Sequence, residues 1–198
     1  MLATLISNFS NINNEIFNED QTNDPDGYRH KYLELKKELF KYNITITTPD
    51  INTINESKLN IYLDVPKKLI INTKAMSVLI INENPIIYKN NWNKSLHDIF
   101  DIIFTWNDDY VDNKKYFKFQ LSYEFPKKII KVPFSNKKFL TLISANKKVR
   151  HSQELYSERL RAIKWFEKNI SNEFDLYGRI WNKLTSPNKL LNFIFIKF

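Results

Sequence analysis

Short apolar runs separated by polar stretches characterise the first 107 residues of the chain. Each run has the length and the β-branched and aromatic content of a buried strand. The runs occupy residues 1–7, 43–50, 59–66, 76–85 and 101–107. Strands that alternate with helical or irregular connections are typical of parallel sheets. The pattern therefore predicts an α/β protein with an open, mostly parallel, Rossmann-like sheet that carries helices on its faces.

A different periodicity marks residues 28–42, between the first two runs. Their apolar side chains recur at the intervals of a helix. The positions are Tyr32, Leu35, Leu39 and Tyr42. We expect an amphipathic helix there, with its charged side chains facing solvent. A shorter helical piece is expected near Ser95–Phe100, whereas the Asn- and Asp-rich residues 8–26 predict a loop.

The pattern becomes irregular from Lys114 to Phe134. Pro126 and Pro133 lack the main-chain N–H that a sheet ladder needs, which restricts this stretch to edge strands or a linker. Beyond it the alternation of strand and helix signals restarts. We therefore place a domain boundary near Ser135 and Asn136.

The boundary separates a first domain, residues 1–135, from a second, residues 136–198. The second is expected to begin with one strand–helix–strand unit. Its elements are a strand at Phe139–Ser144, a helix at Ser152–Lys168 and a strand at Glu173–Tyr177. The carboxyl-terminal sequence LLNFIFIKF is apolar, and its nine residues are too few to span a bilayer. Its alternatives are docking on its own domain, pairing with a partner chain and peripheral contact with a membrane.

Composition narrows the possible chemistry. The chain has no cysteine, which removes disulfides, thiolate metal sites and cysteine nucleophiles. His30, His97 and His151 lack the spacing of metal ligands, so no metal site is expected. Gly27 and Gly178 are the only glycines, whereas dinucleotide fingerprints and Walker-type loops need several within a few residues. Any phosphate must then be held by side chains and a helix terminus.

The net charge of +8 favours anionic partners, although acidic residues are interspersed along most of the chain. No helix-turn-helix, zinc or aromatic strand motif accompanies the charge, so a nucleic-acid partner is not expected. The sequence opens without a basic-then-apolar secretory leader, and no apolar run approaches the roughly 20 residues that span a bilayer. A cytoplasmic location is therefore expected.

Glu83 is the first candidate for chemistry, because it follows the apolar run in LIINENPIIY directly. Ligands of open parallel sheets bind at the carboxyl ends of the strands. A carboxylate on a rigid strand end can act as a general base. The alternative is an acid of a solvated loop.

The second candidate site is the basic loop of LISANKKVRHSQELYSERL, which carries Lys147, Lys148 and Arg150 between a strand and a helix. Cations at the amino end of a helix oppose its dipole by a few tenths of a kcal/mol each. A bound diphosphate would make the arrangement favourable, and the planar arginine side chain suits phosphate oxygens. The alternative is a solvated lysine-rich loop.

The helix after this loop has an ordinary apolar stripe. The stripe consists of Tyr156, Leu160, Ile163 and Phe166. Trp165 is expected to pack rather than to provide a stacking surface.

Both candidate sites lie in segments with a recognisable order of residues. In LISANKKVRHSQELYSERLRAIKWFEKNISNEFDLYGRIW, a strand ending in Ser and Asn precedes an Arg, a helix and a strand ending in Tyr-Gly. This order resembles the family-ten glycosyltransferases, the alpha-1,3-fucosyltransferases and their bacterial relatives. NENPIIY is similar to the family's Glu-Ser-Pro segment, with Asn84 where Ser is usual. DIIFTWNDDYVD and GYRHKYLELKKEL also resemble bacterial members, so the resemblance runs from about Tyr28 to Trp181.

The resemblance implies a two-lobed, inverting glycosyltransferase of the GT-B type that uses no metal or other cofactor. It would transfer fucose from GDP-fucose to a hydroxyl of a glycan, so a nucleotide sugar and a glycan acceptor are the implied partners. Glu83 would deprotonate the attacking hydroxyl. Arg150 would contact the donor diphosphate, while Ser144 and Asn146 would line the donor site and Tyr177 would lie close to it.

One departure from the family concerns length. Family members continue well past the Tyr-Gly strand and include a Glu-Lys pair that grips the nucleotide sugar, whereas this sequence ends at Phe198. We therefore expect a complete acceptor lobe and a truncated donor lobe. The protein is then fucosyltransferase-like or, alternatively, a non-catalytic module of glycosyltransferase ancestry that binds a glycan or a partner chain.

Overall fold

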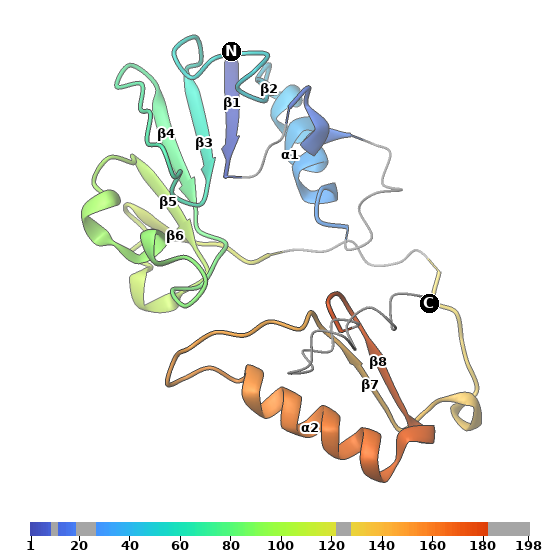
Figure 1. The fold of residues 1–198 in the computed structure, drawn as a ribbon. Coiled ribbons are helices and arrows are strands. Elements are labelled where there is room, and N and C mark those ends of the chain that lie inside the picture. The colour runs from blue at the N-terminus through green and yellow to red at the C-terminus, as the bar shows by residue number, and fades with distance from the viewer. Residues whose placement is uncertain (9–11, 19–26, 122–127, 182–198) are drawn as a thin grey trace, which may run out of the picture. The chain divides into compact units, whose positions relative to one another are not determined.

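The chain forms two compact units, residues 1–127 and 128–198 (Figure 1). The computed structural model describes residues 1–8, 12–18, 27–121 and 128–181. The boundary expected near Ser135 and Asn136 falls inside the second unit. The carboxyl-terminal sequence LLNFIFIKF, for which docking, pairing with a partner chain and peripheral membrane contact were the alternatives, lies outside the described residues.

The first unit is built on a six-stranded sheet in the order β2-β1-β3-β4-β5-β6, and every pairing in it is parallel. Its strands are β1 (Leu2–Ser7), β2 (Thr45–Thr47), β3 (Leu59–Leu63), β4 (Met76–Ile80), β5 (Ile102–Thr105) and β6 (Tyr116–Lys118). This topology confirms the predicted open parallel sheet of an α/β, Rossmann-like fold. β6 comes from the irregular stretch and is an edge strand.

Alternate side chains of the strands fill an apolar core on each face of the sheet, because successive residues of a strand point to opposite faces. Ile61 and Val78 are paired in register and belong to one core, whereas Tyr62 and Leu79 are the next pair and belong to the other. Burial on both faces explains why these strands read as continuous apolar runs.

Helix α1 (His30–Lys41) covers the first of these cores (Figure 1). Tyr32 is buried, and Leu35 and Leu39 pack against the core as the periodicity predicts. Tyr42 does not, because the helix ends at Lys41 and the Tyr42 side chain is 76% exposed. The preceding loop contains one 3-10 turn, η1 (Glu15–Phe17), which packs on the same core.

The connections from β4 to β5 and from β5 to β6 contain 3-10 turns, and one of these turns stands where a helical piece was expected. The turns are η2 (Lys89–Trp92), η3 (Lys94–Leu96) and η4 (Asp108–Tyr110). Asn93 Oδ1 accepts a hydrogen bond from Ser95 N, and Asn107 Oδ1 accepts one from Asp109 N. Such local side-chain bonds compete with a helical backbone. The helical piece expected near Ser95–Phe100 is therefore only η3.

A buried polar cluster lies inside the first unit. Thr4 is completely buried on β1, and its Oγ1 donates to Asn52 O over 2.9 Å. Ser57 Oγ accepts from Asn52 Nδ2 over 2.6 Å and also shares a hydrogen bond with Thr4 Oγ1. The cluster attaches the segment after β2 to strand β1.

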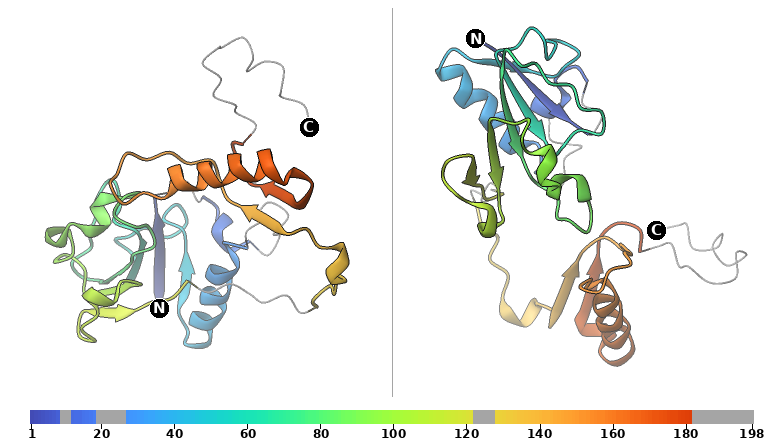
Figure 2. Two further views of the ribbon diagram at one scale, coloured as in Figure 1. Left: turned by 90° about the horizontal axis from the view of Figure 1, so that it is seen from below. Right: turned by 90° about the vertical axis from the view of Figure 1, so that its left-hand side faces the viewer.

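The second unit contains the predicted strand–helix–strand order. Its elements are η5 (Phe134–Asn136), β7 (Leu140–Ile143), α2 (Tyr156–Asn169), η6 (Ser171–Glu173) and β8 (Phe174–Tyr177). β7 and β8 pair in parallel, and α2 runs along them (Figure 2). The predicted stripe of α2 is its less exposed side, with Ile163 buried and Phe166 stacked on Phe174. Trp165 packs edge-to-face on Phe166 with ring centroids 5.1 Å apart, as expected, although its side chain lies outside this stripe and is 56% exposed.

Candidate functional site

Glu83 lies three residues beyond the end of β4, after the completely buried Ile81. The turn that follows it is organised by Asn84, whose Oδ1 accepts hydrogen bonds from Ile86 N and Ile87 N over 3.0 and 3.1 Å. The Glu83 side chain is half-buried. Within the described part of the chain, its carboxylate makes no hydrogen bond or ion pair. Both carboxylate oxygens are therefore available to a ligand.

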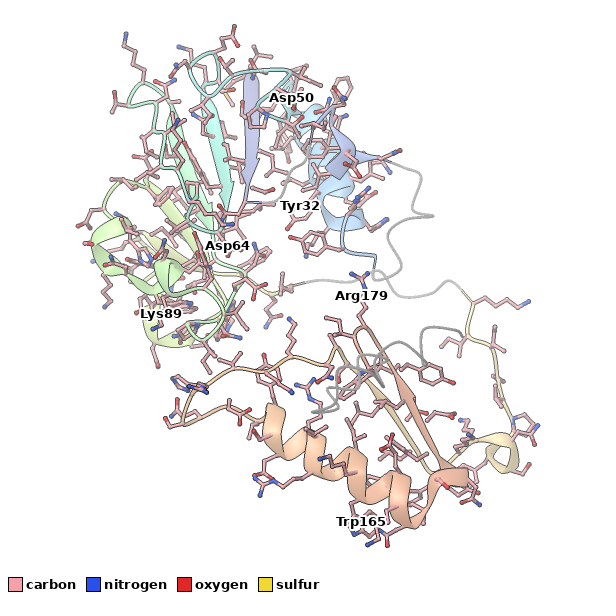
Figure 3. All side chains as sticks on the ribbon, in the orientation of Figure 1. Tyr32, Asp50, Asp64, Lys89, Trp165 and Arg179 are labelled. Carbon is pink, nitrogen blue, oxygen red and sulfur yellow. The ribbon has the colours of Figure 1, made fainter. Side chains whose placement is uncertain are left out.

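Asp64 holds the main chain at this strand end. It is almost completely buried and follows β3, the neighbour of β4 in the sheet (Figure 3). Its Oδ1 accepts from Asn82 N over 2.8 Å and from Glu83 N over 3.1 Å. Its φ of +62° is a left-handed conformation that aspartate tolerates better than most residues. Asp64 thereby joins the carboxyl ends of β3 and β4.

Two tryptophans donate hydrogen bonds to the main-chain oxygens of the same residues. Trp92 Nε1 donates to Glu83 O over 3.0 Å, and Trp106 Nε1 donates to Asn82 O over 3.2 Å. The two indole rings meet edge-to-face with centroids 5.2 Å apart, and Tyr110 packs on Trp92 in the same manner at 5.5 Å. All three aromatic side chains are half-buried. Glu83 thus lies beside a partly exposed aromatic cluster.

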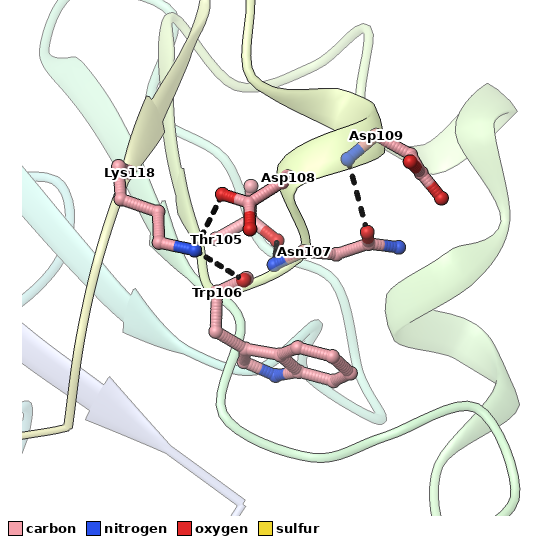
Figure 4. Close-up of polar contacts among 6 residues, drawn as sticks. All are labelled: Thr105, Trp106, Asn107, Asp108, Asp109 and Lys118. Carbon is pink, nitrogen blue, oxygen red and sulfur yellow. Dashed lines mark hydrogen bonds and ion pairs between the residues drawn. The ribbon is translucent and has the colours of Figure 1, made fainter.

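The segment that carries Trp106 is fixed by polar contacts (Figure 4). Lys118 Nζ donates to Trp106 O over 2.9 Å and forms an ion pair with Asp108 at 2.5 Å. Asn107 Oδ1 accepts from Asp109 N over 3.1 Å, which starts η4. These contacts link β6 to the end of β5, so the aromatic cluster is supported from two strands.

The second candidate site is a cavity of about 420 Å³ at the start of α2 in the second unit. The predicted donor-site residues Asn146 and Arg150 both line it. The complete lining is Asn146, Lys147, Lys148, Val149, Arg150, Glu154, Tyr156, Ser157 and Leu160. Three cationic side chains therefore share one cavity with a single carboxylate.

The helix after the basic loop begins later than predicted, and an acidic side chain bonds to its amino end. The expected start was Ser152, whereas α2 begins four residues later, at Tyr156. Lys147, Lys148 and Arg150 therefore precede its first turn by several residues. Glu154 Oε2 accepts a hydrogen bond from Ser157 N over 2.9 Å at the amino end, where an acid is favourable. The hydrogen bonds with Ser157 also lower the pKa of Glu154. The negative partner of the helix terminus is thus this glutamate.

The other two residues that the resemblance assigns to the donor site lie elsewhere in the second unit. Ser144 N donates to Tyr177 O over 2.9 Å, which extends the pairing of β7 and β8. Ser144 Oγ is buried and has no hydrogen-bond partner within the described residues. Tyr177 is 55% exposed, and neither residue lines the cavity. The structure therefore brings Asn146 and Arg150 together and leaves Ser144 and Tyr177 outside that group.

Sequence reasoning missed the residues that surround Glu83, namely Asp64, Trp92 and Trp106. Asp64 offered the same signal as Glu83, because in LDVP an acid directly follows an apolar run. The tryptophans offered no such signal, since their role depends on contacts between separate segments.

The described residues contain no group of three or more metal-ligating side chains that could hold an ion. In the same part of the chain, no helix combines the length and the apolar character needed to cross a membrane. Comparison of the sequence with protein-family models, and of the chain with curated proteins and solved structures, found no match.

Proposed function

We propose that this protein is a fucosyltransferase-like glycosyltransferase of the GT-B type, in which Glu83 removes the proton from an acceptor hydroxyl. The reaction would transfer fucose from GDP-fucose to a glycan, as the resemblance to the family-ten glycosyltransferases implies. The observation that carries the proposal is the state of Glu83: its main chain is held on both sides and its carboxylate is unoccupied. A general base needs this combination of fixed position and free oxygens.

The surroundings of Glu83 also suit a sugar acceptor. Sugar rings have apolar C–H faces and polar edges, so they bind where aromatic side chains lie beside hydrogen-bonding groups. Trp92, Trp106 and Tyr110 supply an aromatic surface beside the main chain of Asn82 and Glu83. These contacts support a glycan as the acceptor class.

The cavity of the second unit supports an anionic donor. Lys147, Lys148 and Arg150 line it together. Arginine and lysine are the side chains that hold phosphate oxygens when no glycine-rich loop is available. We assign the diphosphate of the nucleotide sugar to this cavity, with Arg150 as its principal contact and Asn146 beside it. Ser144 and Tyr177 have no such support from the cavity.

Release of GDP from GDP-fucose in the presence of glycan acceptors tests this function. We expect turnover by the wild-type chain and its loss in Glu83→Gln, which keeps the size of the side chain but removes its basicity. Asp109→Asn is a matched control, because Asp109 is exposed and its own side chain has no role in the assigned chemistry. Equal turnover in wild type and Glu83→Gln would remove Glu83 from the mechanism.

A non-catalytic glycan- or partner-binding module is the second candidate. Glu154 favours it, because a carboxylate among the cations of the cavity weakens the attraction for a diphosphate. A binding module would show affinity for a glycan or a partner chain without any release of GDP. Calorimetry with the acceptor alone, combined with the release assay, separates the two functions.

A further inference from the structure

The carbonyl oxygen of Glu83 accepts hydrogen bonds from two consecutive residues of η2. Trp92 Nε1 donates to it over 3.0 Å, and Asn91 Nδ2 donates over 3.3 Å. Asp64 Oδ1 accepts from the N–H of the same residue. Both main-chain polar groups of Glu83 are therefore bonded to side chains, and its own side chain remains free for a ligand.

Asn91 makes one of these bonds and two further ones with the same side chain. It is completely buried, and each polar atom of its amide is used. Oδ1 accepts from Val65 N over 2.8 Å, while Nδ2 donates to Asp64 Oδ1 over 2.6 Å and to Glu83 O. One side chain thus joins the segment after β3 to the segment after β4. Buried amides with every hydrogen bond satisfied fix a single local conformation.

The main chain of Asn91 is anchored in turn by His97. His97 is completely buried, and its Nε2 lies 2.8 Å from Asn91 O. A carbonyl can only accept, so Nε2 carries the proton, and Nδ1 accepts from the Tyr116 hydroxyl over 3.0 Å in the neutral ring. Tyr116 belongs to β6. The position of Asn91 is therefore set by β3, β4 and β6 together.

We propose that Asn91 and Trp92 are positioning residues for Glu83, which fix the direction in which its carboxylate leaves the strand end. The inference rests on the proposed function, in which Glu83 is the base. A base acts only within about 2.6–3.2 Å of the proton that it removes. Displacement of a reacting group by about 1 Å costs on the order of 100-fold in rate. The hydrogen bonds of Asn91, Trp92 and Asp64 to the Glu83 main chain, together called the clamp, supply that accuracy.

The substitution Asn91→Asp tests this role in the full-length chain. It keeps the size of the side chain but puts an oxygen where Nδ2 faces Asp64 Oδ1 and Glu83 O, so both contacts become repulsive. We expect the amides of Asn82 and Glu83 to exchange with solvent at least about tenfold faster, as followed by NMR. The kcat for GDP release should fall about 10- to 100-fold with little change in the KM for the acceptor.

Asn90→Asp is the matched control. Asn90 is the preceding residue of η2, its side chain is exposed, and the substitution changes the charge by the same amount. It should leave both amide exchange and kcat at wild-type values. In Asn91→Asp, core amides such as that of Leu79 should exchange at the wild-type rate. If they accelerate as much as Asn82 and Glu83 do, the whole unit is destabilised and the positioning role is overturned.

Trp92→Phe provides a second variant that does not depend on the stability of Asn91→Asp. It removes the Nε1 donor to Glu83 O and retains an aromatic ring. Local acceleration at Glu83 supports the inference, and unchanged exchange at Glu83 contradicts it. Trp165→Phe, on the exposed side of α2, is its control.

If wild type releases no GDP, the proposed function fails, and exchange at Glu83 alone then decides whether the clamp exists.

Discussion

Gly178 lies so close to Ser144 that a Cβ atom at Gly178 would be 1.9 Å from the Ser144 carbonyl oxygen. This contact occurs where the chain leaves β8 beside the end of β7. The φ of Gly178 is +136°, a conformation that side chains rarely adopt. The end of the second sheet therefore has room only for glycine.

Gly178→Ala is expected to destabilise the second unit by about 3 kcal/mol or more, because backbone strain and overlap with a main-chain carbonyl add together. Urea denaturation and amide exchange at β7 and β8 measure this loss. Gly27→Ala is the control, since Gly27 also has a positive φ of +62° but, among the described residues other than its chain neighbours, no atom lies within 4 Å of its Cβ position. That control should cost only about 1–2 kcal/mol. Equal losses in the two variants would contradict the close contact.

Thr4→Val should destabilise the first unit by about 1–3 kcal/mol. The substitution preserves the shape of the side chain but removes the hydroxyl that bonds to Asn52 and Ser57 in a fully buried cluster. Thr45→Val, at an exposed position of the neighbouring strand β2, should be close to neutral. Chemical denaturation of both variants provides the comparison, and a neutral Thr4→Val would show that the cluster adds nothing to stability.

His97 should make the first unit sensitive to mild acid. Burial lowers the pKa of His97, and the hydrogen bond with the Asn91 carbonyl partly opposes this shift. Of the nearby charges, Lys115 and Lys94 lower the pKa, whereas Asp98 raises it. An unfolded histidine titrates near about 6.5, so the unfolded chain takes up the proton first as the pH falls. Stability should therefore be constant above that pH and decline below it, by at most about 1.4 kcal/mol per pH unit, until the folded pKa is reached.

The measurement is urea denaturation at several pH values between 5 and 8. His97→Gln should be less stable at neutral pH, and the histidine-dependent part of its slope should disappear. His151→Gln, in the exposed loop before α2, should keep the wild-type slope. An unchanged slope in His97→Gln would assign the acid sensitivity to other groups.

Glu154→Gln should tighten the binding of inorganic pyrophosphate and of GDP to the cavity of the second unit. The hydrogen bonds with Ser157 lower the pKa of Glu154, so its side chain is a carboxylate at neutral pH among Lys147, Lys148 and Arg150. Removal of one exposed charge predicts a change of about two- to fivefold in Kd. Arg150→Ala should weaken binding, while Arg161→Ala, on α2 outside the cavity lining, should not. Calorimetry that detects no pyrophosphate binding by wild type would contradict a phosphate site there.

The sheet was predictable from sequence because its strands are buried on both faces. Continuous apolar runs such as the one around Leu79 have no other simple interpretation in a chain of this composition. For the stretch that contains β6 the prolines left edge strands or a linker as alternatives, and the structure forms an edge strand there. Helix α1 was found from its periodicity, although the prediction extended it to Tyr42, because periodicity does not mark where a helix ends.

The candidate site was less predictable, because the residues that form it are distant in sequence and come into contact only in the folded chain. Glu83 was found since an acid after an apolar run is a local signal. The roles of Asn91 and His97 depend on contacts with β3 and β6, which no local pattern encodes. The start of the helix after the basic loop was predicted four residues too early, because the polar residues before Tyr156 carry no periodicity that marks the first turn, and Glu154 rather than a ligand bonds to the N–H of Ser157.

The strand order has a consequence for synthesis of the chain. β1 is made first, yet its neighbours β2 and β3 follow only at Thr45–Thr47 and Leu59–Leu63. During synthesis, the apolar side chains of β1 therefore lack their β3 neighbours until the chain has emerged from the ribosome as far as Leu63. Parallel pairings between such distant segments form slowly. During that interval the nascent chain presents an unpaired apolar strand, which is the kind of segment that chaperones protect from aggregation.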